Sequence, residues 1–306
     1  MLNRFQGSLI GLAIGDAIGT TVEFKKPGTF HKVTDMIGGG VFDLPKGCWT
    51  DDTSMALCLA ESLITHKQFD PIDQMERYVK WYRAGHLSSI GKCFDIGNAT
   101  AEALKTFERT GEPFSGSDNP HSAGNGSIMR LAPVPLFFSD DLEEAVKWSA
   151  QSSKTTHAAK ECVDACRLFG AMIACAAKGL SKEELLHPQT FEFLWSREPL
   201  SPRIEEISQG SYKRLNPPDI QGSGYVVKSL EAALWAFYHG ESFEEGVLLA
   251  VNLGDDADTT GAIYGQLAGA HYGIEAIPRR WLEPLAMKEL ILDYASKLQT
   301  NRIIME

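Results

Sequence analysis

Two short segments far apart in the chain carry an unusual density of oxygen ligands. Residues 254–260, GDDADTT, hold three carboxylates and two threonine hydroxyls, and residues 50–53, TDDT, hold two of each. No lysine or arginine occurs between Lys228 and Arg279 to neutralise the later segment. Each segment precedes an apolar stretch with helical periodicity, so we expect both Thr/Asp clusters to lie at helix entrances.

Two interpretations of these clusters are open. Threonine and aspartate commonly cap helices, and acids in the first turn suit the helix dipole. One cap needs only one side chain, however, and several partly buried carboxylates raise one another's pKa. Divalent cations would remove that penalty, and oxygen ligands without adjacent histidine or cysteine suit Mg²⁺ or Mn²⁺ better than zinc. We therefore hypothesise a two-metal centre, with capping plus solvated surface as the alternative.

The elements that position these clusters include two helices with a repeated glycine. One set recurs every four residues near the N-terminus and the other follows the 254–260 cluster: Gly7, Gly11, Gly15 and Gly19, and Gly261, Gly265, Gly269 and Gly273. This spacing places each set along one helical face, where another helix can approach closely. Glycine inside a helix costs about 1 kcal/mol relative to alanine, so a packing reason is expected. We predict that the two helices pack deep in the core, which would bring Asp16 and Glu23 near residues 254–260.

Helical periodicity dominates the rest of the chain. Asp70 is placed as an N-cap before Pro71, and further helices are predicted at roughly 53–66, 97–109, 141–179, 223–239 and 279–298. Two segments, about 24–50 and about 110–140, do not fit a helix, and irregular segments of this length are often functional. We predict an all-α fold with at most a short strand or two, in a single domain over residues 1–306.

Composition limits the class of partner. Of the 306 residues, 43% are hydrophobic and 23% charged, and the net charge is −11. That charge argues against a nucleic-acid surface or an anionic membrane as partner, because both favour Lys/Arg patches. The six cysteines are scattered without a CxxC pair, and no secretory signal is visible, so we expect a cytoplasmic protein. We also expect a monomer.

Six motifs together resemble one family. In chain order they are GLAIGDAIGTTVEF, WTDDTSMAL, CFDIGNAT, GNGSIMRLAPV, GSGYVVKSLEAALWAF and GDDADTTGAIYGQLAGAHYG. They are similar to the ADP-ribosylglycohydrolases over about residues 5–275, most of all to the bacterial dinitrogenase reductase-activating glycohydrolases. The resemblance implies an all-α, single-domain orthogonal helical bundle that holds two divalent cations, Mg²⁺ or Mn²⁺. Carried over by motif, the metal ligands are Thr50, Asp51, Asp52, Asp256, Asp258 and Thr259.

The same resemblance implies substrate contacts. Glu23 and Asp95 correspond to catalytic carboxylates, and Asp95 and Asn98 to a pair that contacts the ribose. Glu23 could instead be a surface acid, and Asp95 or Asn98 could instead cap the helix that follows. A glycine-rich loop is expected to present backbone N–H groups to a diphosphate, though a plain turn would have the same composition. Its members are Ser122, Gly124, Asn125 and Gly126. His157 and Tyr225 are expected to contact the ligand, with a structural histidine and a core aromatic as the alternatives.

The implied reaction is hydrolysis of the glycosidic bond between ADP-ribose and an acceptor. The branch favours ADP-ribosyl-arginine on a protein, with small-molecule ADP-ribose conjugates and modified nucleic acid left open as substrates. Two other functions compete: a two-metal phosphohydrolase or pyrophosphatase that cleaves the diphosphate, and a non-catalytic ADP-ribose-binding protein. The sequence does not decide whether Glu23 or Asp95 transfers the proton.

Overall fold

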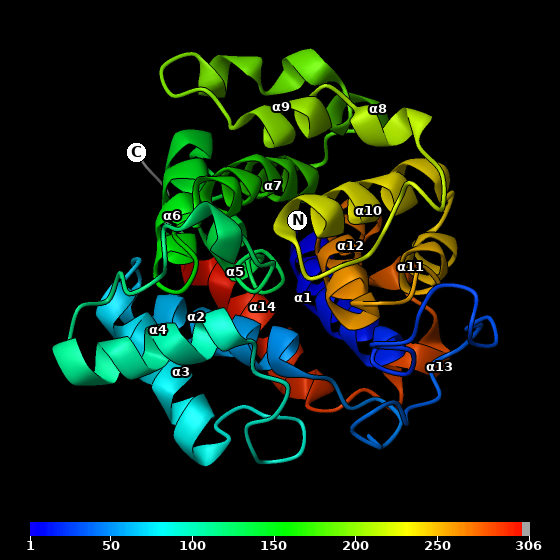
Figure 1. Cartoon of the computed structure of the whole chain (residues 1–306), viewed down its shortest axis with the longest axis horizontal. Coiled ribbons are helices and arrows are strands. Elements are labelled where there is room, and N and C mark those ends of the chain that lie inside the picture. The colour runs from blue at the N-terminus through cyan, green and yellow to red at the C-terminus, as the bar shows by residue number, and fades with distance from the viewer. Residues whose placement is uncertain (302–306) are drawn as a thin grey trace.

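The computed structural model describes residues 1–301, which fold into helices joined by irregular segments (Figure 1). The α-helices are α1 (Leu2–Gly19), α2 (Asp51–His66), α3 (Pro71–Ala84), α4 (Asn98–Thr110), α5 (Pro133–Phe137), α6 (Leu142–Lys154), α7 (Lys160–Lys178), α8 (Lys182–Leu185), α9 (Pro202–Ser208), α10 (Val226–His239), α11 (Phe243–Val251), α12 (Ala257–Tyr272), α13 (Arg279–Leu282) and α14 (Lys288–Asn301). Short 3₁₀-helices occur at Pro120–Ser122 (η1), Pro188–Thr190 (η2), Glu192–Trp195 (η3), Ser211–Arg214 (η4) and Ile274–Ala276 (η5). Within residues 1–301 only isolated β-bridges form, and the all-α prediction is confirmed.

Helices α1 and α12 form an antiparallel pair at the centre of the molecule (Figure 1). The glycine repeats face each other: a Cβ atom at Gly11 would lie 2.3 Å from the carbonyl oxygen of Gly265, and one at Gly15 would lie 2.0 Å from that of Gly261. Even an alanine methyl group is excluded, because real Cβ atoms do not approach backbone oxygens so closely. The predicted packing of the two glycine helices is therefore confirmed.

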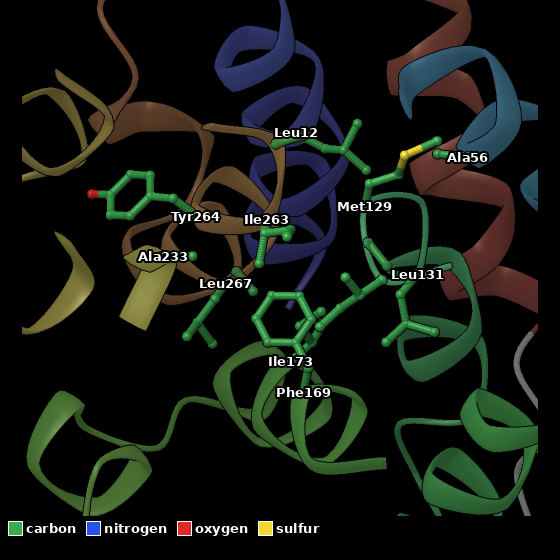
Figure 2. Close-up of a cluster of buried hydrophobic side chains, with 14 of the residues drawn as sticks. Leu12, Ala56, Met129, Leu131, Phe169, Ile173, Ala233, Ile263, Tyr264 and Leu267 are labelled. Carbon is green, nitrogen blue, oxygen red and sulfur yellow. The ribbon is translucent and has the colours of Figure 1, made fainter. Parts of the chain in front are cut away.

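Other helices surround this pair and bury a continuous apolar core. Helices α7, α10 and α11 pack on α12, whereas α2 and α14 pack on α1. Figure 2 shows Leu12 of α1 and Leu267 of α12 among side chains from these neighbours, including Phe169 and Ile173 of α7. Full burial of each such side chain contributes roughly 1.5–3 kcal/mol to folding. None of the helices within residues 1–301 is long and apolar enough to cross a bilayer.

Most predicted helices are confirmed, but two are interrupted. The segment 141–179 forms α6 and α7 separated by residues 155–159, where Oγ1 of Thr155 donates to the carbonyl of Ser152 and Oγ1 of Thr156 accepts from Arg130. A hydroxyl-to-backbone bond such as that of Thr155 competes with the backbone bonds of a continuing helix. The segment 279–298 breaks into α13 and α14 around Pro284. Asp70 caps α3 as predicted, accepting hydrogen bonds from the N–H groups of Ile72 and Asp73.

The two segments that do not fit a long helix are irregular in the structure. Residues 24–50 contain no helix, and residues 110–140 contain only η1 and the five-residue α5. Both segments run next to the acidic ends of the central helices, where residues Glu23, Phe24 and Gly124 line a common cavity. Their irregular backbone therefore shapes the candidate site.

Candidate metal centre and substrate cavity

Asp16 organises the entrance of α2. It lies fully buried in α1, and its Oδ1 accepts hydrogen bonds from the backbone N–H (2.8 Å) and Oγ1 (2.9 Å) of Thr50. Its Oδ2 accepts from the N–H (3.1 Å) and Oγ1 (2.6 Å) of Thr53. These four bonds fix the first Thr/Asp cluster against the central helix and lower the cost of burying the Asp16 charge. Burial still raises the pKa of Asp16 to about 6.

The two Thr/Asp clusters converge. Oγ1 of Thr50 lies 3.2 Å from a carboxylate oxygen of Asp52 and 3.2 Å from one of Asp258, which comes from the second cluster. A single hydroxyl proton cannot satisfy these acceptors together with Asp16. Thr50 and Asp256 stand at the N-cap positions of α2 and α12, yet neither side chain caps its helix. Capping therefore does not account for these residues.

Two further carboxylates, those of Glu23 and Asp95, meet Asp258 at this point. The three residues each offer one oxygen, and these oxygens lie within 4.8 Å of one another. Burial, reinforced by the neighbouring aspartates, raises the pKa of Glu23 to about 10 and that of Asp95 to about 7. Asp95 adopts a left-handed backbone conformation (φ 60°), which aspartate tolerates better than most residues and which is common at functional sites.

The buried carboxylates fit a hard divalent cation. Burial is the largest cause that raises the pKa of Asp51, Asp52 and Asp258 well above the ordinary value, and repulsion by nearby carboxylates adds to it. One oxygen in each of Glu23, Asp52 and Asp258 is buried without a hydrogen-bond partner among residues 1–301. Buried oxygens of this kind are costly unless protonated or bound to a cation. Because the donor set consists of carboxylates and hydroxyls, it suits Mg²⁺ or Mn²⁺.

A cavity of about 370 Å³ opens onto the acidic cluster. Its walls include four of the six predicted metal ligands, Asp51, Asp256, Asp258 and Thr259, together with Glu23, Asp95, Asn98, Gly124, Asn125, Gly126 and His157. Thr50 and Asp52 lie fully buried. The structure thus brings the six predicted ligands into one region, although the tightest carboxylate group combines Asp258 with the two predicted catalytic acids.

The glycine-rich loop is tied to the second cluster. Nδ2 of Asn125 donates to Oδ2 of Asp256 (2.8 Å), and the backbone N–H of Asn125 donates to the carbonyl of Gly224 (3.1 Å). The N–H groups of Ser122 and Gly124 also bond to carbonyl groups in the protein. Fewer backbone N–H groups of this loop are therefore free to bind a diphosphate than predicted. Of the four predicted loop residues, only Gly126 makes no backbone N–H bond within residues 1–301.

His157 lies beneath this loop, in the break between α6 and α7. Its Nδ1 is 2.8 Å from Oγ1 of Thr156, and a Cβ atom on Gly126 would lie 2.8 Å from its Cε1. Burial, with a smaller effect of Arg130, lowers the pKa of His157 to about 3, so its imidazole is neutral at physiological pH. A neutral ring that lines the cavity can hydrogen-bond to a ligand but cannot act there as a cationic acid.

A larger cavity, of about 920 Å³, adjoins the first and shares Asn98 and Gly124 with it. Ser122 and Tyr225 line this outer cavity. Tyr225 is 36% exposed and donates a hydrogen bond to Oε2 of Glu161 (2.7 Å), so the core-aromatic alternative is wrong. The N-cap residue of α4 is Gly97, and no side-chain hydrogen bond within residues 1–301 caps the start of this helix. Neither Asp95 nor Asn98 is therefore a cap.

Three residues that shape the site or line its cavities are absent from the predicted set. Asp16 was expected near the second cluster but without a role, although an acid in an apolar glycine-rich helix signals buried partners. Phe24 lines the inner cavity and Glu161 the outer one. Neither carries a local signal, because an aromatic residue in a loop and an acid at a helix start are ordinary features.

Comparison with known proteins decides the family. The sequence profile of the ADP-ribosylglycohydrolase family matches residues 1–303. The chain belongs to the ADP-ribosylglycohydrolase family. It is 46% identical to the ADP-ribosylarginine hydrolase Tri1 of Pseudomonas putida, over 97% of this chain and 78% of that protein. It is 30% identical to the ADP-ribosyl-[dinitrogen reductase] glycohydrolase of Rhodospirillum rubrum, over 94% and 91% of the two chains.

A solved structure of an ADP-ribosylglycohydrolase-related protein complex superposes with a TM-score of 0.87, at 42% identity and over 99% of both chains. The ADP-ribosylglycohydrolase fold is thus shared over nearly the whole chain. Membership identifies the protein as a hydrolase of a glycosidic bond to ADP-ribose. The family resemblance inferred from the six motifs is confirmed, and the reaction it implies is favoured over cleavage of the diphosphate.

Proposed function

We propose that this chain hydrolyses the bond between ADP-ribose and an arginine side chain of a protein, using two divalent cations, Mg²⁺ or Mn²⁺. The names of the relatives in Pseudomonas putida and Rhodospirillum rubrum support the reaction and a protein substrate. The observation that carries the metal requirement is that one buried carboxylate oxygen in each of Glu23, Asp52 and Asp258, beside an open cavity, has no hydrogen-bond partner in the described part of the chain.

The proposed cation ligands are the hydroxyls of Thr50 and Thr259 and the carboxylates of Asp51, Asp52, Asp256 and Asp258. When bound, such cations supply Lewis-acid chemistry for the hydrolytic water and neutralise the buried carboxylates. Asn125 would orient Asp256 through their 2.8 Å hydrogen bond.

The chain's own groups would hold the substrate along the two cavities. The ribose next to the scissile bond would lie on the acidic floor of the inner cavity, with the diphosphate near Gly126 and the neutral imidazole of His157. The adenosine end would reach the outer cavity beside Asn98, Ser122 and Tyr225. Positive charge that develops at the anomeric carbon would be stabilised by the surrounding carboxylates. Glu23 and Asp95, whose carboxyl groups bind protons more tightly than usual, would move the proton.

Product analysis tests this proposal. We expect metal-loaded protein to convert ADP-ribosyl-arginine into intact ADP-ribose and arginine. Mass spectrometry would follow the products, and serine-linked and acetyl-linked ADP-ribose would be compared as substrates. EDTA should abolish turnover, and added Mn²⁺ or Mg²⁺ should restore it. Asp256→Ala should lose turnover while its circular dichroism stays that of the wild type. Release of AMP and ribose phosphate would identify a pyrophosphatase instead, and full activity in metal-free protein would contradict the metal centre.

We also propose that the chain acts as a single-domain monomer in the cytoplasm. The buried hydrophobic side chains form one core cluster, which supports a single domain. All six cysteines are free thiols, which suits a reducing compartment.

A further inference from the structure

Phe24 stands at the rim of the inner cavity in an unusual state. Its side chain is 62% exposed, although it lines the cavity next to Glu23. Its backbone is left-handed, with φ at 59°, a conformation that a bulky aromatic residue rarely adopts. An exposed ring does not contribute the hydrophobic free energy that its burial would give. The left-handed backbone conformation adds strain. The ring is not part of the buried core cluster of residues 1–301, so it is available to contact a ligand at the cavity.

Hydrogen bonds hold the backbone of Phe24 at the rim of the cavity. The N–H of Phe24 donates to the carbonyl of Asp255 (2.6 Å), and the N–H of Asp255 donates to the carbonyl of Lys25 (2.8 Å). This reciprocal pair joins the chain after α1 to the chain before α12. Asp255 is itself left-handed (φ 51°), so both sides of the bridge accept strain. Glu23 follows α1 and Asp258 lies in α12, so this bridge fixes the backbone of Phe24 relative to the acidic cluster.

The chemistry around Phe24 favours a cation. The inner cavity is lined by the carboxylates of Glu23, Asp51, Asp95, Asp256 and Asp258, and among residues 1–301 no lysine or arginine lines it. The adjacent Lys25 directs its Nζ to the carbonyl of Thr21 (3.1 Å). An aromatic face beside carboxylates attracts a planar guanidinium through cation–π and stacking contacts. A neutral serine or acetyl acceptor gains much less from such a face.

We infer that Phe24 is a specificity-determining residue whose ring receives the guanidinium of the acceptor arginine while ADP-ribose occupies the two cavities. This inference rests on the proposed function and extends it to the acceptor side. It assigns the ring a contact with the acceptor, not with ADP-ribose.

The test compares Phe24→Leu with wild type. Leucine keeps apolar bulk and the same left-handed backbone penalty but removes the π face, whereas Phe24→Trp preserves that face. We expect kcat/KM for ADP-ribosyl-arginine to fall about 5- to 10-fold in Phe24→Leu and to stay within about twofold in Phe24→Trp. The inhibition constant of the product ADP-ribose should stay within about twofold in both, because the acceptor is absent from it. Phe193→Leu, which removes a ring that is 60% exposed outside both cavities, is the matched control and should behave as wild type.

Each outcome decides the inference. If wild type and Phe24→Leu cleave ADP-ribosyl-arginine equally well, the assignment of Phe24 is overturned while the proposed function stands. If Phe24→Leu weakens ADP-ribose inhibition as much as it lowers kcat/KM, the ring contacts ADP-ribose and the acceptor assignment is wrong. If wild-type protein cleaves no ADP-ribosyl-arginine, the proposed function fails and the inference fails with it.

Discussion

At the scale of single residues, the site depends on one buried acid that contacts no cavity. Asp16 accepts hydrogen bonds from the backbone and hydroxyl groups of both Thr50 and Thr53. It thereby turns Oγ1 of Thr50 toward Asp52 and Asp258, the two carboxylates of the opposed clusters. Groups that orient metal ligands in this way commonly influence metal affinity almost as strongly as the ligands themselves.

Asp16→Asn tests this positioning role. The amide replaces one acceptor oxygen with an N–H₂ donor, so either Thr50 or Thr53 loses its partner. We expect Mn²⁺ affinity, measured by calorimetric titration, to fall about 10- to 100-fold. The free energy of unfolding should fall by about 1–3 kcal/mol, because a buried donor is left unsatisfied.

Asp43→Asn is the control for this substitution. Asp43 is exposed, and asparagine accepts its left-handed backbone (φ 51°) equally well. It should match wild type in both measurements. Unchanged Mn²⁺ affinity in Asp16→Asn would refute the positioning role of Asp16.

At the scale of elements, backbone contact between α1 and α12 delivers the acids. The two helices run antiparallel, so the residues that follow the end of α1 lie beside the start of α12. A Cβ atom at Gly19 would lie 2.3 Å from the carbonyl oxygen of Ala257. Close approach at this end brings Glu23 within reach of Asp258. The glycines lower the helix stability of α1 and α12, but they permit the close approach that brings the acidic residues together.

Gly11→Ala tests this contact away from the acids. The added methyl group would lie 2.3 Å from the carbonyl oxygen of Gly265, which is backbone and cannot rotate aside. We expect the free energy of unfolding, measured by urea denaturation, to fall by about 1–3 kcal/mol or more. Stability equal to that of wild type would show that the helices do not touch at Gly11.

At the scale of the whole molecule, burying the acidic cluster lowers the stability of the folded state, and bound cations would offset this loss. The chain carries a net charge of −11, and its acidic cluster lies inside the fold. In metal-free protein, burial raises the pKa of Asp16 to about 6 and that of Asp95 to about 7, from an ordinary value of 3.8. The folded state therefore binds these protons more tightly than the unfolded chain does. The resulting stabilisation is present below about pH 4 and is lost as the pH rises through 6 to 7.

Melting temperatures should report this linkage. Because the pKa values of Asp16 and Asp95 are higher in the folded state than in the unfolded chain, protein in EDTA should lose stability between about pH 5 and pH 8. Bound Mn²⁺ replaces the protons, so we expect it to raise Tm, and to raise it more at the higher pH. The measurement is a thermal melt at both pH values with EDTA or Mn²⁺. Asp95→Asn, which removes one titrating carboxyl group, should show a smaller loss of stability in EDTA. A shift in Tm with Mn²⁺ that is independent of pH would contradict this account.

The sequence by itself determined the helical class, the pairing of the glycine helices and the family. The helical class and the helix pairing depend on local periodicity, as in the glycine repeats that include Gly11 and Gly265. The family depends on the order of short motifs, such as the one that contains residues 50–53. The glycine helices also predicted that Asp16 and Glu23 lie near residues 254–260, whereas a shared metal centre of the two Thr/Asp clusters was a hypothesis from their composition. The one-domain and monomer interpretations, and the roles of the site residues, stay predictions.

Only the tertiary structure decided how the side chains are partnered. In the break between α6 and α7 that holds His157, Oγ1 of Thr156 accepts a hydrogen bond from Arg130, which lies in a loop remote in the chain. The bond from the Asn125 N–H to Gly224 and the bond that holds the backbone of Phe24 to Asp255 likewise join segments remote in the chain. Hydrogen-bond partners and burial are properties of the packed molecule, and local sequence spacing does not encode them.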